Sequence, residues 1–207
     1  MTPYQEEMPN PWLTMWRRPR ETVRMYLQSG SAKWLWILAV LAGIKLFLDN
    51  ADAQNAGDQI AFGNIILLSL AFGPLVGIFY WYLFSGLFTL TGQILGLPGR
   101  WSDMRKAVGL SFVPVASLMP LWLLKLVLFG SEVFTTWTPV LDSSGWLLGL
   151  IVLFYLLDFV IGGWYLVTLS RSVAEVYECS AWLAFALILL SSAVFAVVLS
   201  FVLLFFV

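Results

Sequence analysis

Long runs of apolar residues alternate with short polar segments along the chain. Five runs are too long and too apolar for helices of a soluble core, and four of them reach the roughly 20 residues that cross a hydrocarbon layer about 30 Å thick. The first run is shorter, and it spans the layer once Lys33 is counted, with Trp34 and Trp36 as headgroup anchors. The pattern predicts an all-α polytopic membrane protein, a bundle of five transmembrane helices. The spans are expected at about 33–49, 60–92, 107–129, 145–169 and 181–207.

A different pattern precedes the first span, because aromatic and aliphatic residues alternate there with arginines. Asn10-Pro11 supplies a helix cap followed by proline at the first helical position, and Pro19 restarts the helix. The segment is expected to be an amphipathic helix, broken at Pro19, in the cytoplasmic headgroup layer, where an arginine near anionic lipid gains about 1 kcal/mol. The residues expected to bind headgroups or a partner are Trp12, Trp16, Arg17, Arg18, Arg20 and Arg24.

Two roles stay open for this segment: an anchor that only orients the first span, and a docking surface for a cytoplasmic protein. Residues 1–10 are polar and are expected to form a mobile tail. The chain is therefore expected to divide into a tail with an interfacial helix, residues 1–30, and a transmembrane domain, residues 31–207.

Basic residues between the spans fall on alternate sides of the membrane. The segment before the first span, the second-to-third loop and the fourth-to-fifth loop hold nine Lys or Arg residues, and the other two loops hold none. The positive-inside rule therefore predicts a cytoplasmic N-terminus and a C-terminus on the outer side. The cytoplasmic loop residues available to a partner are Arg100, Arg105, Lys106, Arg171 and Glu175.

Composition excludes a soluble protein and makes an enzyme the least expected class. The chain is 60% hydrophobic and 11% charged, whereas soluble domains carry about 25% charged residues. Its net charge of −1 gives no indication of nucleic-acid binding. With no histidine and a single cysteine, Cys179, the chain lacks the commonest general base and metal ligand and cannot form an internal disulfide. We expect no metal and no cofactor.

Three ionisable residues fall inside the spans, where such groups are functional candidates by default. Lys45 and Lys125 each lie about one turn from the outer end of the expected helix, so both are expected to extend to the headgroups, Lys45 with Asp49 four residues on. Asp158 is 13 residues from Gly145, about 19 Å deep. Neither lysine is expected to reach it easily, so Asp158 is expected to be protonated and to donate a hydrogen bond. A structural role and a role in ion or lipid passage both stay open.

The second span has 33 residues and contains Gly73-Pro74, which is expected to kink or break it. A kink would be healed by neighbouring helices, whereas a break would leave unwound backbone lining a cavity. Small residues four apart, such as Gly73 and Gly77 or Gly145 and Gly149, predict close helix contacts. These contacts can form within one chain or between copies in a homo-oligomer.

Three further motifs extend over nearly the whole chain: Asn10-Pro11-Trp12 followed by Trp16-Arg17-Arg18-Pro19-Arg20, Gly96-Leu97-Pro98-Gly99 before Ser111-Phe112-Val113-Pro114, and Ala174-Glu175-Val176 before Ser180-Ala181-Trp182. Together they resemble the Yip-domain family of five-span membrane proteins, named from Ypt-interacting proteins, and the first looks like the opening of bacterial members. The resemblance implies the bacterial cytoplasmic (inner) membrane. Eukaryotic relatives act in vesicle traffic and associate with small GTPases, but no GTPase-binding residues carry over to this chain.

Two functions follow from these observations. The first is a non-enzymatic bundle that organises membrane or recruits a membrane or cytoplasmic protein, in a bilayer containing anionic lipids. The alternative is a small transporter, channel or lipid scramblase that uses Asp158 and the second span.

Overall fold

The computed structural model describes residues 10–29 and 33–206, and every regular element within them is a helix. Five helical segments are long and apolar enough to cross a membrane, which confirms the expected all-α architecture. Most of the tail expected at residues 1–10 lies outside the described residues. The candidate spans are Lys33–Ala53, Phe62–Ile94, Trp101–Phe134, Gly145–Val176 and Ala181–Val202.

These helices form two compact units, and the long helices α4 (Phe62–Ile94) and α9 (Gly145–Val176) each contribute to both. In unit 1 the end of α4 from Tyr82 and the end of α9 from Leu166 combine with α1 (Pro11–Thr14), α2 (Pro19–Ser29), α5 (Trp101–Ser111) and α10 (Ala181–Phe206). In unit 2 the earlier parts of α4 and α9 combine with α3 (Lys33–Ala53), η1 (Ala56–Asp58), α6 (Val113–Ala116), α7 (Met119–Phe129), η2 (Gly130–Phe134) and α8 (Pro139–Asp142).

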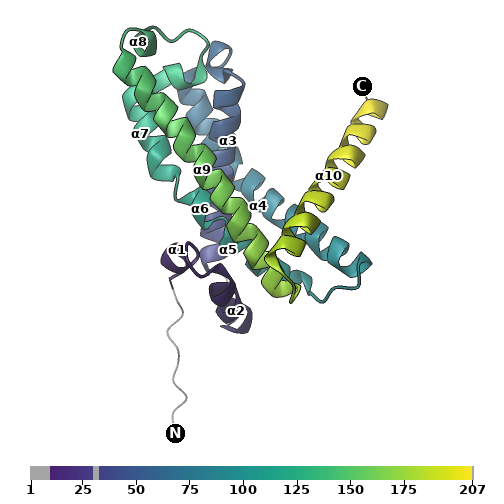
Figure 1. Cartoon of the computed structure of the whole chain (residues 1–207). Coiled ribbons are helices and arrows are strands. Elements are labelled where there is room, and N and C mark those ends of the chain that lie inside the picture. The colour runs from purple at the N-terminus through teal and green to yellow at the C-terminus, as the bar shows by residue number, and fades with distance from the viewer. Residues whose placement is uncertain (1–9, 30–32, 207) are drawn as a thin grey trace. The chain divides into compact units, whose positions relative to one another are not determined.

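The core of unit 2 forms where α3 packs against α6, α7 and η2. Trp122 of α7 is buried and stacks on Phe134 of η2, with ring centroids 5.8 Å apart. Phe129 meets Phe154 of α9 edge to face. Figure 1 shows α7 beside this part of α9. The aromatic packing holds the third and fourth spans together.

Glycines set the closest helix contact in unit 2. A Cβ on Gly43 of α3 would lie 2.1 Å from the Gly73 carbonyl oxygen of α4, and a Cβ on Gly77 would lie 2.0 Å from the Ala39 carbonyl oxygen. The close approach expected at Gly73 and Gly77 is therefore confirmed. At Gly145 and Gly149 an added Cβ would meet open space, so that pair makes no such contact in the structure.

The second span does not break at Gly73-Pro74, because α4 is a continuous helix from Phe62 to Ile94. The hypothesis of unwound backbone there is wrong. Instead the third span, expected as one helix over 107–129, is divided into α5, α6 and α7. Pro114 and Pro120 stand in the first turns of α6 and α7, where a missing N–H costs no intrahelical bond. These two prolines divide the span.

The N-terminal segment is helical and interrupted before Pro19, as the sequence predicts. Asn10 caps α1 by accepting a hydrogen bond from the Trp12 amide. The apolar face of α2 was expected to face the headgroup layer. Its residues Val23 and Tyr26 are instead buried, and α2 packs against α5.

Candidate functional site

A cluster of two buried lysines and two half-buried carboxylates joins α3, α7 and α9 within unit 2, and we call it the intramembrane charge cluster: Lys45, Asp49, Lys125 and Asp158. The Lys125 ammonium donates a hydrogen bond to Asp158 Oδ2 at 2.9 Å. The Lys45 ammonium lies 3.2 Å from Asp158 Oδ1 at an angle unsuited to a hydrogen bond, so that contact is electrostatic. Lys125 is 1% exposed and Asp158 is 19% exposed at the side chain.

The expectation that neither lysine reaches Asp158 is wrong, as is the expectation that both lysines extend to the headgroups. Both expectations depended on the positions of the helix ends, which the structure places further from the lysines. α3 continues to Ala53, so Lys45 is about 12 Å from its end, and η2 extends the segment after Lys125 to about 16 Å. Asp158, about 19 Å from Gly145, is then only a few ångströms deeper, which a lysine side chain reaches. Asp158 is an ion-pair acceptor between two ammonium groups, the arrangement of a carboxylate.

Aromatic side chains enclose these charges. The Lys125 ammonium lies 4.8 Å from the Trp122 ring centroid and 4.4 Å from that of Tyr155, which favours a cation at that position. Trp122 Nε1 donates to Asp49 Oδ1 at 2.8 Å, and Lys45 donates to Asp49 Oδ2 at 2.7 Å. Sequence reasoning missed Trp122 and Tyr155. Their only signal is spacing, since each lies three residues before Lys125 or Asp158, on the same helix face.

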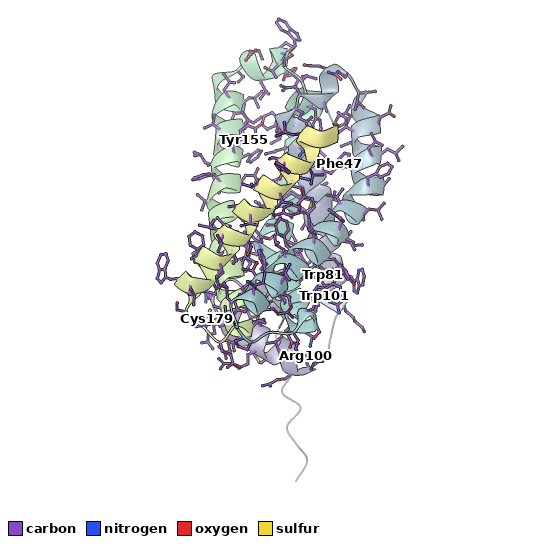
Figure 2. The ribbon with its side chains drawn as sticks, turned by 90° about the vertical axis from the view of Figure 1, so that its right-hand side faces the viewer. Phe47, Trp81, Arg100, Trp101, Tyr155 and Cys179 are labelled. Atoms are coloured by element: carbon purple, nitrogen blue, oxygen red, sulfur yellow. The ribbon has the colours of Figure 1, made fainter. Side chains whose placement is uncertain are left out.

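The cluster continues toward the end of α3 through a third carboxylate, Asp52. The hydroxyl of Tyr155, labelled in Figure 2, donates to Asp52 Oδ1 at 3.0 Å. Beyond α3, the Thr136 hydroxyl donates to Asp58 at 2.7 Å, which joins the two loops expected on the outer side. Among the described residues no group of three His, Cys, Asp or Glu could hold a metal ion. The arrangement can bind helices together or carry charge, but it offers no metal site.

A second ionic cluster lies in unit 1, and we call it the N-terminal clamp: Arg20, Arg24 and Glu175. Arg24 Nε donates to Glu175 Oε1 at 2.6 Å, and Arg20 Nε lies 3.5 Å from Glu175 Oε2. Arg20 also donates to the carbonyl oxygens of Ala174 and Cys179, at the turn between α9 and α10 where Figure 2 labels Cys179. The hydrogen bond to Glu175 raises the pKa of the Arg24 guanidinium. The clamp fastens α2 to that turn.

Helix α5 is fastened to α2 and α4 within the same unit. Lys106 donates to the Leu27 carbonyl oxygen at 3.0 Å. The Arg105 guanidinium lies 5.2 Å from the Tyr82 ring centroid and 5.1 Å from that of Trp101 and donates to the Tyr82 hydroxyl. Two of the expected loop residues, Lys106 and Glu175, thus contact the N-terminal segment directly.

The remaining predicted residues are distributed around these contacts. Four arginines are exposed: Arg17, Arg18, Arg100 and Arg171. Arg18 lies 3.6 Å from Glu21. Trp12 and Trp16 are partly buried. Unit 1 therefore brings together residues from all three segments expected to be cytoplasmic.

A comparison with known protein families identifies the family of this chain. A family profile described as Yip1 domain matches residues 13–204. The chain belongs to the Yip1 family. It is a multi-pass membrane protein of Yip type, and the family is not known as enzymatic. Neither a curated protein nor a solved structure matches the chain.

The motifs that carried the family resemblance meet in the structure of this Yip1-family chain. Arg20, from the first motif, contacts Ala174 and Glu175, from the last. Tyr177 follows that motif and was missed by sequence reasoning. Its hydroxyl donates to the Phe88 carbonyl oxygen, and a Cβ on Gly92 would lie 2.4 Å from its ring. Burial raises the pKa of Tyr177 to about 12, so the hydroxyl stays protonated as a donor.

Proposed function

We propose that this Yip1-family chain is a non-enzymatic protein of the bacterial cytoplasmic membrane that organises membrane and recruits a partner through unit 1. Its N-terminus lies in the cytoplasm and its C-terminus on the outer side, as the alternation of basic loops predicts. The partner surface is formed by α1 and α2, the loop before α5 and the turn after α9.

The observation that carries the proposal is the N-terminal clamp. An amphipathic anchor needs only lipid on its apolar face, whereas Val23 and Tyr26 of α2 are buried in protein. Arg20 and Arg24 are both committed to Glu175, so the clamp holds α2 in a defined place. This preorganisation lowers the ordering cost that a partner's binding must offset.

The surface has a basic and apolar character that indicates the partner's chemistry. Arg17, Arg18 and Arg100 are exposed, and Leu13, four residues before Arg17, is 71% exposed. Exposed arginines attract carboxylate or phosphate groups over a Debye length of about 8–10 Å. We expect an acidic protein segment to bind here, at a bilayer surface containing anionic headgroups.

Site-specific photo-crosslinking in native membranes tests this function. A photoreactive residue at Leu13 should form a protein adduct, whereas one at Val160, 63% exposed on α9, should label lipid. Charge reversal by Arg17→Glu with Arg18→Glu should abolish the Leu13 adduct while the chain remains folded. An adduct that is insensitive to this reversal, or lipid labelling alone at Leu13, contradicts partner recruitment.

One observation favours the alternative of a conduit. The intramembrane charge cluster and the Asp52–Tyr155 pair form a continuous series of polar groups from mid-span to the end of α3. Proton relays in membranes use such series. Ion flux and lipid flip-flop should be measured in vesicles with wild type and with Lys125→Met/Asp158→Asn. Activity present in wild type and lost in this folded variant would favour the conduit over the scaffold.

A further inference from the structure

Unit 2 contains a cavity lined by α3, η1 and the part of α4 from Ile65 to Tyr80, beside a crossing of α3 and α4 that is built from glycines. At that crossing Gly43, Gly73 and Gly77 bring the two backbones into direct contact. Beside the crossing, larger side chains of α3, η1 and α4 surround a cavity of about 300 Å³. Ligand pockets begin near this size, at about 300 Å³.

The walls of the cavity follow one stripe on each helix. On α4, Ile65, Leu68 and Val76 recur at helical spacing, and on α3 Phe47 and Ala51 do the same. Figure 2 labels Phe47 on α3. Phe72 lies on the same α4 stripe and is 51% exposed, so the stripe continues onto the membrane-facing surface of α4.

The lining changes in character along the cavity. Most of the lining is apolar, the Tyr80 hydroxyl is the one polar side-chain group that α4 contributes to it, and Asn50 and Gln54 stand near the end of α3. Gln54 Nε2 donates to Asn50 Oδ1, and the pair still offers an Asn50 N–H and the Gln54 carbonyl oxygen. The lining includes no charged residue. The cavity therefore matches a molecule with an apolar tail and a polar, hydrogen-bonding head.

The size of the cavity limits what can occupy it. A transmembrane helix is about 10–12 Å across, so each 10 Å of its length fills roughly 900 Å³. The cavity cannot hold the helix of a second copy. Water needs several polar partners in such a space, and the side chains of the lining supply only the Tyr80 hydroxyl and the Asn50 and Gln54 amides. A single acyl chain is thin enough to enter.

We propose that this cavity binds one acyl chain of a bilayer phospholipid, with the glycerol ester region at Asn50 and Gln54. The source is the surrounding membrane, because neighbouring α4 residues Leu67 and Leu75 are 64% and 61% exposed on a helix that spans it. The site has no charged residue, so it selects the chain and ester region and not the headgroup charge. The proposal goes beyond the proposed function and uses no residue of the N-terminal clamp.

The test uses the full chain in nanodiscs containing phosphatidylcholine with a diazirine midway along one acyl chain. After photolysis and digestion, the label should be enriched at Leu68 and Phe47 over the lipid-facing Leu67. Phosphatidylglycerol with the same diazirine should label equally. Val76→Trp fills the cavity and should lower labelling of Leu68 several-fold, whereas Leu75→Trp adds the same ring outside the cavity and should leave it unchanged.

Several outcomes would overturn the proposal. Equal labelling of Leu67 and Leu68 would mean ordinary annular lipid. Labelling by a diazirine fatty acid but not by the phospholipids would assign the cavity to a free acid. A Gln54→Cys variant that forms disulfide-linked dimers efficiently would indicate a second copy. If Val76→Trp does not fold, Leu68→Trp fills the cavity from the same wall with labelling read at Phe47, and the wild-type enrichment remains decisive by itself.

Discussion

Helix α9 carries two carboxylates, and each lies between two cations from other segments. In unit 2 Asp158 accepts from Lys125 and faces Lys45, and in unit 1 Glu175 accepts from Arg24 and faces Arg20. The environments differ. The Lys45 and Lys125 side chains are 8% and 1% exposed, whereas those of Arg20 and Arg24 are 42% and 64% exposed.

The same ionic motif therefore serves two purposes in one chain. An exposed guanidinium keeps most of its hydration, so breaking its ion pair changes stability little. A buried ammonium without its carboxylate keeps the full desolvation cost, and removing one partner of a buried pair costs about 3–5 kcal/mol. The intramembrane charge cluster holds helices together, whereas the N-terminal clamp positions a surface segment.

The largest expected effect is that of Asp158→Asn. The substitution keeps the shape of the side chain but leaves the Lys125 ammonium buried without an anion, while Lys45 retains Asp49. We expect the free energy of unfolding in mixed micelles to fall by about 3–5 kcal/mol. Denaturation in increasing SDS, followed by tryptophan fluorescence, measures it. An unchanged midpoint would mean that Asp158 is protonated and not ion-paired.

The next largest effect is the recovery of the stability that Asp158→Asn removes. Lys125→Met combined with Asp158→Asn removes both members of the buried pair, and most of the lost stability should return, since replacing a whole buried pair with apolar groups is often neutral. Lys125→Met alone should cost less than Asp158→Asn, because Lys45 still faces Asp158. The double-mutant cycle gives the coupling energy. Additive losses would show that the contact does not stabilise the fold.

The sequence predicted five membrane-spanning helices because each depends on a local property, a run of apolar residues near 20 long. The division of the third span could also have been predicted from the sequence. Pro114 and Pro120 stand six residues apart in that span, whereas Pro74 is a single proline, and the helix continues through it.

The contacts of the candidate sites could not be predicted in the same way. Whether Lys45 and Lys125 reach Asp158 depends on where three helices end relative to one another, which is a tertiary property. The amphipathic pattern of α2 identified its apolar face correctly, but it could not tell burial against α5 from burial in lipid. The pattern gives the polarity of a face and not the identity of what covers it.

A smaller effect is expected from Glu175→Gln, the matched isosteric change in the N-terminal clamp. The loss in global stability should be several-fold below that of Asp158→Asn, because the arginines stay hydrated. Amide hydrogen exchange in α2 should rise in the variant, and in wild type it should rise with salt, since exposed pairs are screened. Two results would contradict this difference between the clusters. One is an SDS unfolding midpoint of the wild-type protein that changes with salt, and the other is an amide exchange rate in α2 that does not.

The smallest effect concerns Cys179, whose carbonyl oxygen accepts from Arg20. Burial raises the pKa of its thiol, and the nearby charge of Arg20 only partly offsets this. A raised pKa leaves less thiolate at neutral pH, and the thiolate is the reactive form. Alkylation of Cys179 at pH 7 should therefore be several-fold slower than alkylation of an exposed thiol introduced as Gln28→Cys with Cys179→Ala. As the pH is raised, the two alkylation rates should approach one another. Equal rates at pH 7 would show that the α9–α10 turn is not covered by α2, and that the clamp is open in the membrane.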